Sequence, residues 1–253
     1  MARILVAGES WMTHCVHVKG FDSFTTSVYV EGLATFRAAV EAEGHTVVHQ
    51  PCHVAADHFP ETIDELNGYD IVVLSDIGAN TLLLPARTFE QARIGPNRLE
   101  VLGEWVATGG GLAMVGGYLS FTGIGAKANY RGTALAAVLP VEMEPFDDRQ
   151  EAPQGIRFKL TDTTHPITNG LDSEWPPVLG FQRFSAKDGT DTLVATGEHP
   201  VLVVGRHGAG RVLAFATDIG PHWAPPAFLA WPGFQGLWGN AMRWLAGDAT
   251  DAA

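Results

Sequence analysis

The chain has 253 residues, of which 46% are hydrophobic and 17% charged, a composition typical of globular domains. Its formal net charge of −12 at pH 7 disfavours electrostatic attraction to nucleic acid or to an anionic membrane surface. No stretch reaches the roughly 20 apolar residues that a membrane-spanning helix needs, and the amino terminus lacks the features of a signal peptide. We therefore expect a cytoplasmic protein with neither nucleic-acid nor membrane partners.

The first half of the chain alternates between predicted strands and predicted helices. The predicted strands are Arg3–Gly8, His45–His49, Tyr69–Ser75 and Leu112–Val115, and the predicted helices are Tyr29–Glu43 and Arg98–Thr108. The strands are short apolar runs, while the helices carry apolar residues at helical spacing. This order predicts an α/β fold with a mainly parallel sheet covered by helices on both faces.

The second half has shorter β-like segments separated by Pro, Gly and Asp turns. These segments are Pro140–Glu144, Gly155–Leu160, Val178–Phe184, Thr192–Ala195, Val201–Val204 and Val212–Ala216, and a closing helix is predicted at Phe234–Leu245. We find no linker or internal repeat. We therefore predict a single domain over residues 1–247 with a β-rich insertion at about 140–200, followed by a frayed tail at 248–253.

A glycine-rich segment, residues 109–121, contains a short apolar strand and then a sharp turn at Gly116 and Gly117. In α/β hydrolytic folds, a strained turn of this kind leads from a strand into a helix and exposes a nucleophile above the sheet. Here the turn continues with Tyr118, and the first hydroxyl of a serine comes at Ser120. The segment therefore predicts the corner of a nucleophile elbow without its nucleophile.

Polar or conformationally permissive residues follow four predicted strands. They are Glu9, Ser10 and His14 after the first strand, Asp76 and Asn80 after Tyr69–Ser75, Gly116, Gly117 and Tyr118 at the glycine turn, and Asp218, His222 and Trp223 after Val212–Ala216. Ligands of open parallel sheets bind beyond the carboxyl ends of the strands. We therefore expect a small-molecule site there, although aspartates and serines at these positions also cap helices.

Two pairs in this set suit acid–base chemistry, Asp218 with His222 and Glu9 with His14, because a carboxylate orients an imidazole and tunes its pKa. We assign catalysis to Glu9, Asp76, Asp218 and His222, and ligand binding to the other seven residues. Ten histidines make a metal site conceivable, but no H-E-x-x-H or comparable spacing is present. We therefore predict no metal and no cofactor.

The chain also resembles a known family through five motifs. They are Gly-Glu-Ser-Trp (8–11), Lys-Gly-Phe-Asp (19–22), Leu-Ser-Asp-Ile-Gly-Ala-Asn-Thr (74–81), the segment 109–121 and Thr-Asp-Ile-Gly-Pro-His-Trp (217–223). With these motifs, spread over nearly the whole chain, it resembles the bacterial proteins described as putative glutamine amidotransferases, a branch of the class I glutamine amidotransferase-like superfamily. The resemblance implies a flavodoxin-like three-layer α/β/α sandwich.

Glutaminases of this superfamily use a Gly-x-Cys-x-Gly elbow and a later His-x-Glu pair. Here Tyr118 stands at the cysteine position, and His222 is followed by Trp223 and Ala224. Classical glutamine hydrolysis is therefore not expected.

Three functions remain open at this stage. The first is an enzyme, of hydrolase or lyase type, that acts on a small polar metabolite by acid–base chemistry, with the amides of the elbow glycines holding an oxyanion or carboxylate. The second is a non-catalytic ligand-binding or scaffolding protein that kept the fold. The third is a glutaminase that uses a displaced cysteine, Cys15 or Cys52. Tryptophans near the carboxyl end make a homo-oligomer a further expectation.

Overall fold

An eight-stranded sheet forms the centre of the molecule in the computed structural model, which describes residues 1–247. The expected tail, 248–253, lies outside the described residues. The strands follow the order β4 (Thr46–Gln50), β1 (Arg3–Gly8), β5 (Ile71–Ser75), β6 (Gly111–Val115), β14 (Gly210–Phe215), β13 (His199–His207), β12 (Asp191–Thr196) and β9 (Lys159–Leu160). The first five run parallel, and the last three extend the sheet by antiparallel pairing.

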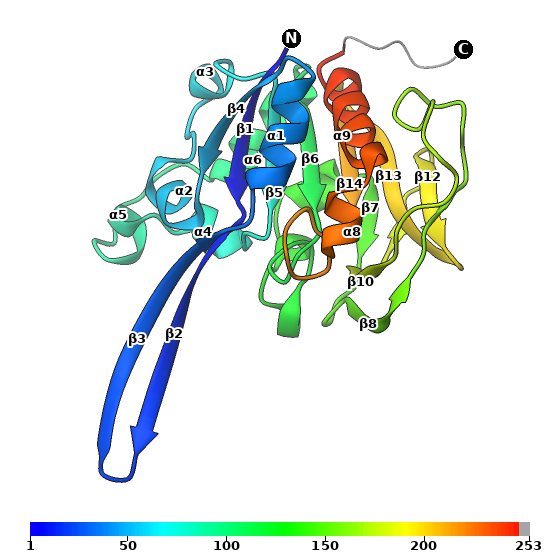
Figure 1. Ribbon diagram of the computed structural model, residues 1–253. Coiled ribbons are helices and arrows are strands. Elements are labelled where there is room, and N and C mark those ends of the chain that lie inside the picture. Colours follow the sequence, from blue (N-terminus) through cyan, green and yellow to red (C-terminus); the bar gives the residue numbers. More distant parts are fainter. Residues whose placement is uncertain (248–253) are drawn as a thin grey trace.

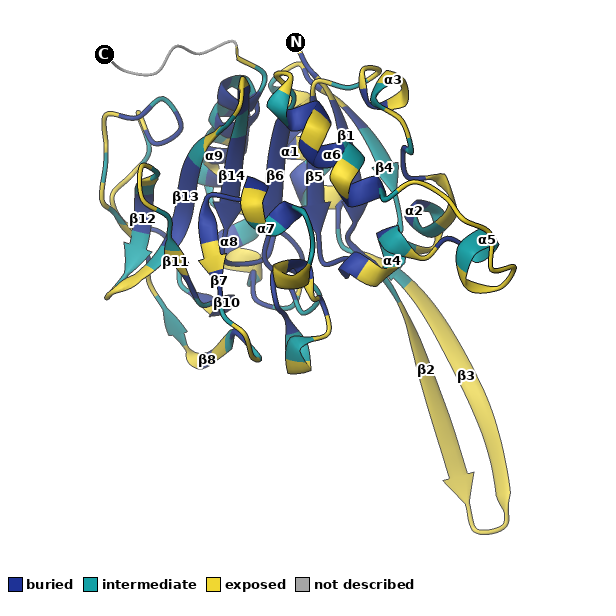
Figure 2. Cartoon of the chain, turned by 180° about the vertical axis from the view of Figure 1, so that it is seen from behind, coloured by how far each residue is buried: buried dark blue, intermediate teal, exposed yellow. Residues whose placement is uncertain are grey.

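Helices cover both faces of this sheet. Helices α1 (Ala34–Ala42) and α9 (Pro232–Leu245) pack against each other over one face, and α6 (Arg98–Ala107) lies over the opposite face (Figures 1 and 2). The remaining short helices are α2 (Cys52–His58), α3 (Ile63–Leu66), α4 (Ala79–Leu83), α5 (Ala86–Phe89), α7 (Leu135–Val138) and α8 (Pro226–Leu229), with 3-10 turns η1 (Ile124–Ala126) and η2 (Tyr130–Gly132). The expected flavodoxin-like α/β architecture is confirmed.

The sequence explains these layers through burial. Strands β5 and β6 are buried at every position, as expected for parallel strands that have helices on both sides. Helix α9 starts with Pro232, which suits the first helical turn because its missing N–H would have no partner there. Within residues 1–247, none of the helices has the length and apolar character that crossing a bilayer requires.

The β-rich region differs in detail from its expected segments. β7 (Val141–Met143) pairs with β11 (Phe184–Ala186), and β8 (Arg149–Ile156) pairs with β10 (Val178–Gln182), so each pair forms a small antiparallel sheet. The predicted segments Gly155–Leu160 and Val178–Phe184 each divide between two strands. In addition, β12 and β9 belong to the main sheet.

A long β-hairpin is the main feature that the sequence analysis missed. β2 (Ser10–Lys19) and β3 (Asp22–Glu31) pair along their full length and project from the body as a separate arm (Figure 1). The predicted helix Tyr29–Glu43 is therefore wrong at its start, because residues 22–31 are rich in Ser, Thr, Val and aromatic side chains that favour strands. Gly20, with a φ of +65°, opens the two-residue turn.

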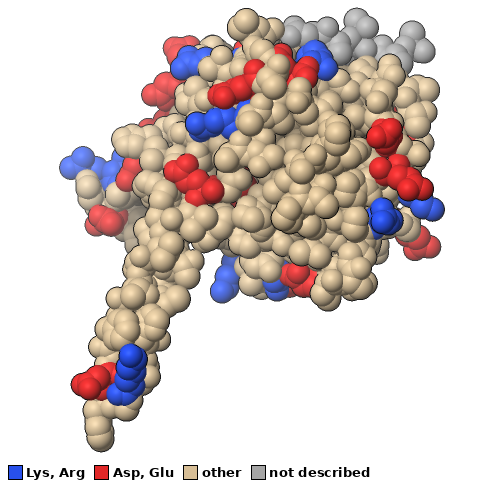
Figure 3. All heavy atoms as spheres, in the orientation of Figure 1, with Lys and Arg blue, Asp and Glu red and all other residues tan. Residues whose placement is uncertain are grey.

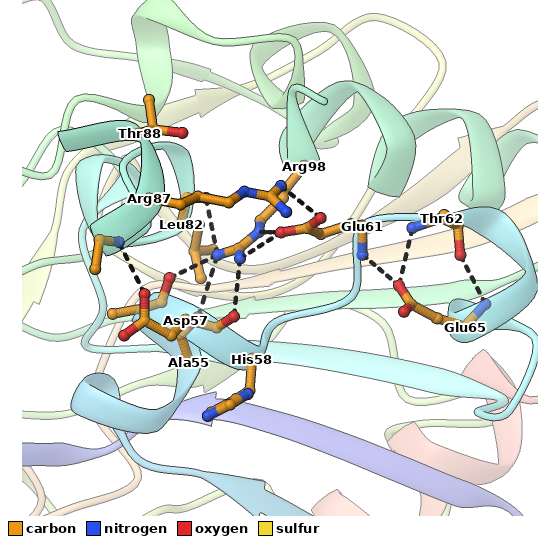
Figure 4. A network of polar contacts seen from close by, with 12 residues as sticks. Ala55, Asp57, His58, Glu61, Thr62, Glu65, Leu82, Arg87, Thr88 and Arg98 are labelled. Atoms are coloured by element: carbon orange, nitrogen blue, oxygen red, sulfur yellow. Dashed lines mark hydrogen bonds and ion pairs between the residues drawn. The ribbon is translucent and has the colours of Figure 1, made fainter. Parts of the chain in front are cut away.

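A buried arginine ties the loop regions beside the sheet together (Figure 4). Arg98, at the start of α6, is 1% exposed. Its guanidinium donates to Glu61 Oε1 at 2.7 Å, to the carbonyl of Ala56 at 2.7 Å and to the carbonyl of Asp57 at 3.1 Å. Burial opposes ionisation of Glu61, but Arg98 and then Arg87 hold the pKa of this carboxyl below its usual value. One guanidinium thus fixes the segment between α2 and α3 against α6.

This network predicts a difference between two arginine substitutions. Arg98→Ala leaves two carbonyls without their donor and removes one of two guanidinium partners from the Glu61 carboxylate, whose side chain is 22% exposed, so it should lower the free energy of unfolding by about 1.5–3 kcal/mol. Arg87→Ala removes a cation that is 38% exposed from the same carboxylate and should lower it by less than about 1 kcal/mol. Urea denaturation of both variants checks this, and equal losses would show that Arg98 does not hold the network.

Candidate functional site

Four neighbouring parallel strands end at one edge of the sheet. The segments that follow β1, β5, β6 and β14 carry Glu9, Asp76, Tyr118 and Asp218, and these strands are consecutive in the sheet order. His222 lies four residues after Asp218, and its Nδ1 is 3.6 Å from Asp218 Oδ2. The structure therefore brings together the four residues to which the sequence analysis assigned catalysis.

Three carboxyl groups are buried in this arrangement. Glu9 is 1% exposed, Asp218 is 0% exposed and Asp76 is 8% exposed. A Cβ added at Gly220 would lie 2.8 Å from Glu9 Oε2 and 3.4 Å from Asp218 Oδ1, so both carboxyl groups crowd around this glycine. Within the described residues, Glu9 Oε2 and Asp218 Oδ2 are buried without a hydrogen-bond partner, an arrangement that is costly when both groups are charged.

The backbone is strained where two of these carboxyl groups are attached. Glu9 has a φ of +48° and Asp76 a φ of +45°, a left-handed conformation that side chains other than glycine seldom adopt. Such strain persists where the surrounding structure enforces it, and it clusters at functional sites. Both residues directly follow a buried parallel strand, so the strain turns their side chains into the same space.

Burial and mutual repulsion raise the pKa of two of these carboxyl groups. The pKa of Glu9 is raised well above its usual value, first by burial and then by the charges of Asp218 and Asp76. The pKa of Asp76 is raised to about 6 by burial and by Asp218, although the Leu119 amide opposes the shift by donating to Asp76 Oδ1 at 2.7 Å. The cluster therefore binds protons more tightly than isolated carboxyl groups do.

His222 lies at the accessible side of this cluster. Its side chain is 31% exposed, and its pKa is raised, first by the close contact with the Asp218 carboxylate. The Tyr118 ring stacks on the imidazole with ring centroids 5.3 Å apart, and the Trp11 ring packs at 4.7 Å. The aromatic rings thus hold an imidazole between the buried carboxyl groups and the solvent.

Sequence reasoning missed two charged residues beside this site, Arg149 and Glu151 of β8. The Arg149 guanidinium lies 5.1 Å from the Tyr118 ring centre, and Glu151 Oε2 accepts from the indole N–H of Trp223 at 3.0 Å. The expected ligand residue Trp223 is 1% exposed. It makes an edge-to-face contact with the Tyr118 ring, so it supports Tyr118 from inside the protein. The charged sequence 147–151 was the available signal.

The glycine turn departs from the expected elbow. The residues after β6 form a loop that reaches only the 3-10 turn η1, so no α-helix begins at the corner. Gly117 has a φ of +151°, and a Cβ there would lie 2.8 Å from Asp76 Cβ, so the close approach of Asp76 requires glycine. The expected strand-to-helix corner is therefore wrong.

The amides of this turn are engaged inside the protein. The Gly116 N–H donates to the Phe215 carbonyl at 2.8 Å, and the Gly117 N–H donates to Gln182 Oε1 at 3.3 Å. Gln182 is 0% exposed and donates in turn to the carbonyls of Gly117 at 2.8 Å and Ser120 at 2.7 Å. The expectation that these glycine amides hold an oxyanion is therefore wrong, because both already have acceptors.

Three expected ligand residues lie elsewhere or serve the fold. His14 is exposed on the arm, where Nδ1 lies 2.8 Å from Ser27 Oγ, so the expected Glu9–His14 pair does not form. Asn80 is exposed in α4, outside the buried cluster. Ser10 is buried, and its Oγ accepts from the Cys52 N–H at 2.7 Å, which joins the start of β2 to α2.

The two thiols are placed differently. Cys15 is exposed on the arm, whereas Cys52 is half-buried, with Sγ 3.7 Å from the Asp76 carbonyl oxygen. Burial raises the pKa of the Cys52 thiol, and the charges of Asp76 and Glu9 add to this. A thiol with a raised pKa is a weak nucleophile at neutral pH because little thiolate is present.

A hollow of about 620 Å³ lies away from the carboxyl groups. It is lined in part by Lys187, Arg206 and Trp244, and Trp244 accepts from Arg211 near the amino end of β14. This hollow is therefore near the end of the sheet opposite Asp218, and Lys187 within it already donates to the Ala136 carbonyl at 2.6 Å. Among residues 1–247, no group of three or more His, Cys, Asp and Glu is placed to hold a metal ion.

Comparison with known proteins gives one family and several similar folds. The model of the family described as "Putative glutamine amidotransferase" matches residues 3–247. Two solved structures from Salmonella typhimurium are similar over their whole length. The cytoplasmic protein STM3548 is 45% identical, with a TM-score of 0.93, covering 96% of this chain and 98% of that one. The cytoplasmic protein STM1381 is 46% identical, with a TM-score of 0.93, covering 96% and 99%.

A more distant structure shares the fold alone. It is a ThuA-like protein from Bacteroides uniformis, which is 11% identical with a TM-score of 0.57 and covers 96% of this chain and 90% of that one. A search of the curated proteins finds no match.

The raised carboxyl pKa values predict how stability depends on pH. Asp76 binds its proton more tightly when folded than when unfolded, so the free energy of unfolding falls as the pH rises from about 4 to about 6, and the loss persists above that. Asp76→Asn removes this charge and suits the positive φ. It should raise the free energy of unfolding by roughly 1–3 kcal/mol at pH 8 and by almost nothing at pH 4.

Asp188→Asn is the matched control, because Asp188 is exposed. This variant should change the free energy of unfolding by less than about 0.5 kcal/mol at both pH values. If Asp76→Asn destabilises the protein equally at pH 4 and pH 8, the folded protein does not disfavour ionisation of Asp76.

Proposed function

We propose that this chain, which belongs to the family described as putative glutamine amidotransferases, is an enzyme that acts on a small polar metabolite by acid–base chemistry without a cysteine nucleophile. The observation that carries the proposal is the Asp218–His222 pair, 3.6 Å apart, at the open side of a buried cluster of carboxyl groups with raised pKa. Titratable groups whose pKa is shifted by burial and neighbouring charge are typical of catalytic sites.

His222 is the group that transfers protons to and from the substrate in this proposal. Asp218 lies at Nδ1, so it fixes the orientation of the ring and stabilises the imidazolium, while Nε2 remains for the substrate. The raised pKa of His222 brings its titration towards neutral pH, where a general acid or base works best.

Glu9 and Asp76 set the charge around this pair. Burial and the neighbouring carboxyl groups raise the pKa of Glu9 well above its usual value, so Glu9 retains its proton more readily than an isolated carboxyl group does. Asp76, with a pKa of about 6, is a second group able to exchange a proton near neutral pH. In known enzymes, too, two carboxyl groups in different environments take separate acid and base roles.

The rim of the site suits a small substrate with polar groups. Tyr118 and Trp11 offer ring faces beside His222, and Arg149 lies next to Tyr118. Aromatic rings with nearby polar groups fit sugars and sugar acids, because such ligands present both C–H faces and hydrogen-bonding edges. Sugar-like or carboxylate-bearing metabolites are therefore the substrates that we propose, and a hydrolase or lyase reaction is the class.

One observation favours the alternative of a binding protein without turnover. The amides of Gly116 and Gly117 already donate within the protein, so the oxyanion-stabilising donors that acyl transfer requires are not free at this turn. A non-catalytic ligand-binding or scaffolding protein of this family would retain the same rim without needing such donors.

The proposed cellular location is the one that the sequence analysis predicts. We propose that the protein works in the cytoplasm on a free small molecule. The two Salmonella typhimurium proteins that are similar to this chain over nearly their whole length are themselves named cytoplasmic proteins.

A substrate screen with matched histidine variants tests the proposal. Purified protein is incubated with a panel of sugars and sugar acids, and with glutamine in parallel, while substrate loss is followed by mass spectrometry. His222→Ala should lower kcat/KM by about 10²–10⁴-fold on any substrate found, because it removes the acid–base group. His58→Ala, which changes an exposed histidine on α2, should leave kcat/KM within about twofold.

Other outcomes separate the alternatives. Full activity of His222→Ala would contradict the proposed mechanism. A ligand that binds the wild type but stays unchanged over hours would favour the binding protein. Ammonia released from glutamine and lost in Cys52→Ala would show a glutaminase with a displaced cysteine.

A further inference from the structure

The β2–β3 arm is an unusual surface for a protein of this charge. Between Ser10 and Glu31 the charged residues are Lys19, Asp22 and Glu31, in a chain whose net charge is −12. Figure 3 shows the arm largely free of charged side chains apart from those near its tip. Exposed strands usually carry charges that prevent association with other strands. Two copies of the chain therefore meet little charge repulsion along the arm.

Both faces of the arm expose apolar side chains. One face carries Phe24 and Val28, which are 49% and 57% exposed. On the other face the apolar side chains alternate with His14, Ser23, Thr25 and Ser27. Residues directly opposite in an antiparallel pair share a face, and the register places Met12 opposite Tyr29 and Val16 opposite Thr25. Met12, Val16, Val18 and Tyr29 lie on this face and are 53%, 69%, 71% and 40% exposed. An isolated two-stranded hairpin is only marginally stable in water, so a face of this kind gains stability when it is covered.

The two ends of the arm carry complementary features. Phe21 at the tip is fully exposed. At the base there is a hollow of about 280 Å³, which is lined by Ser10, Trp11, Met12, Tyr29, Cys52 and His53. The hollow includes Met12 and Tyr29 from the same face as Val16, and its volume is sufficient for an aromatic side chain.

We propose that two copies of this chain form a twofold-symmetric dimer in which the arms lie antiparallel, with the faces that carry Met12 and Val16 together, and each Phe21 enters the hollow at the base of the other arm. This face is the one in contact because Met12 and Tyr29 on it line the hollow. A twofold axis through the middle of the arms places each tip against the base of the other arm, so one rotation produces both tip-to-base contacts. This proposal goes beyond the proposed function and does not depend on it.

The area of such an interface agrees with a stable dimer. Each ten-residue strand is about 33 Å long and the strands lie about 4.8 Å apart, and a buried phenylalanine removes about 150–250 Å² from water. Two facing two-stranded arms, each about 10 Å wide, with two inserted Phe21 rings therefore bury roughly 1,000 Å², which is about the area that a specific interface must reach.

The carboxyl-terminal tryptophans differ in exposure. Trp223, Trp238 and Trp244 are 1%, 1% and 2% exposed and belong to the core. Trp231 is half-buried and packs on Trp175 and Phe228. By contrast, Trp11 joins the hollow to the candidate site, because its ring also packs on His222. The partner's Phe21 would therefore press on a ring that contacts His222.

Light scattering on a sizing column tests the dimer. The wild type should elute with twice the mass of one chain. Phe21→Glu should raise the dimer dissociation constant by at least about tenfold, because it places a charge in an apolar hollow. Thr13→Glu is the matched control, since Thr13 is on the opposite face of the arm, and it should leave the constant within about threefold.

Cross-linking tests the antiparallel register directly. If residue 21 meets the partner's base, Val16 lies near the twofold axis and faces its own copy. Mild oxidation of Cys15→Ser/Val16→Cys should therefore give a disulfide-linked dimer, whereas the wild type, with Cys15 on the outer face, should give none through that residue. A monomeric wild type, a dimer unaffected by Phe21→Glu, or cross-linking through Cys15 alone would each overturn the proposal. Far-ultraviolet circular dichroism confirms that each variant is folded.

Discussion

The structure depends on one constraint: several carboxyl groups are buried close together where four parallel strands end. Glu9 and Asp218 are almost completely enclosed and crowd around Gly220. Three negative charges there would repel each other in a medium that screens them poorly, so the cluster is tolerable only if it retains protons. The raised pKa of Glu9 and of Asp76 expresses this requirement. A folded chain that maintains such a cluster gives up stability, and active sites are where that loss is commonly found.

The surrounding fold holds this cluster in place through neutral contacts. Gln182 fastens the loop after β6 with three hydrogen bonds to Gly117 and Ser120. Ser120 Oγ in turn accepts from the Asp76 N–H at 3.1 Å, and Ser75 donates to Glu9 Oε1 at 3.3 Å. The amides and hydroxyls that anchor the carboxyl groups thus come from β5, from the loop after β6 and from the antiparallel region. The glycine turn accommodates Asp76, because a Cβ at Gly117 would lie 2.8 Å from Asp76 Cβ.

The sheet could be predicted from the sequence because its strands are continuous apolar runs, such as Ile71–Ser75 and Gly111–Val115, whose burial on both faces leaves little choice of structure. The meeting of Glu9, Asp76, Asp218 and His222 followed from the same logic, since each lies in the segment that follows a buried strand. His14 was misplaced because Ser10–Lys19 continues as a strand instead of returning to the sheet. Residues 29–31, which end the second strand of the arm, were wrongly predicted as the start of a helix. Gln182 and Arg149 come from far along the chain, and local patterns carry no information about contacts of that kind.

Protonation of Glu9 at neutral pH is the central claim, and infrared spectroscopy measures it most directly. A protonated carboxyl group absorbs at a carbonyl frequency distinct from that of a carboxylate, so the difference spectrum between the wild type and Glu9→Gln at pH 7 isolates this residue. The account predicts a protonated-carboxyl band in the wild type that is lost in Glu9→Gln and that persists when the exposed Asp188 is changed to Asn. A wild-type spectrum at pH 7 that contains only carboxylate bands would contradict it.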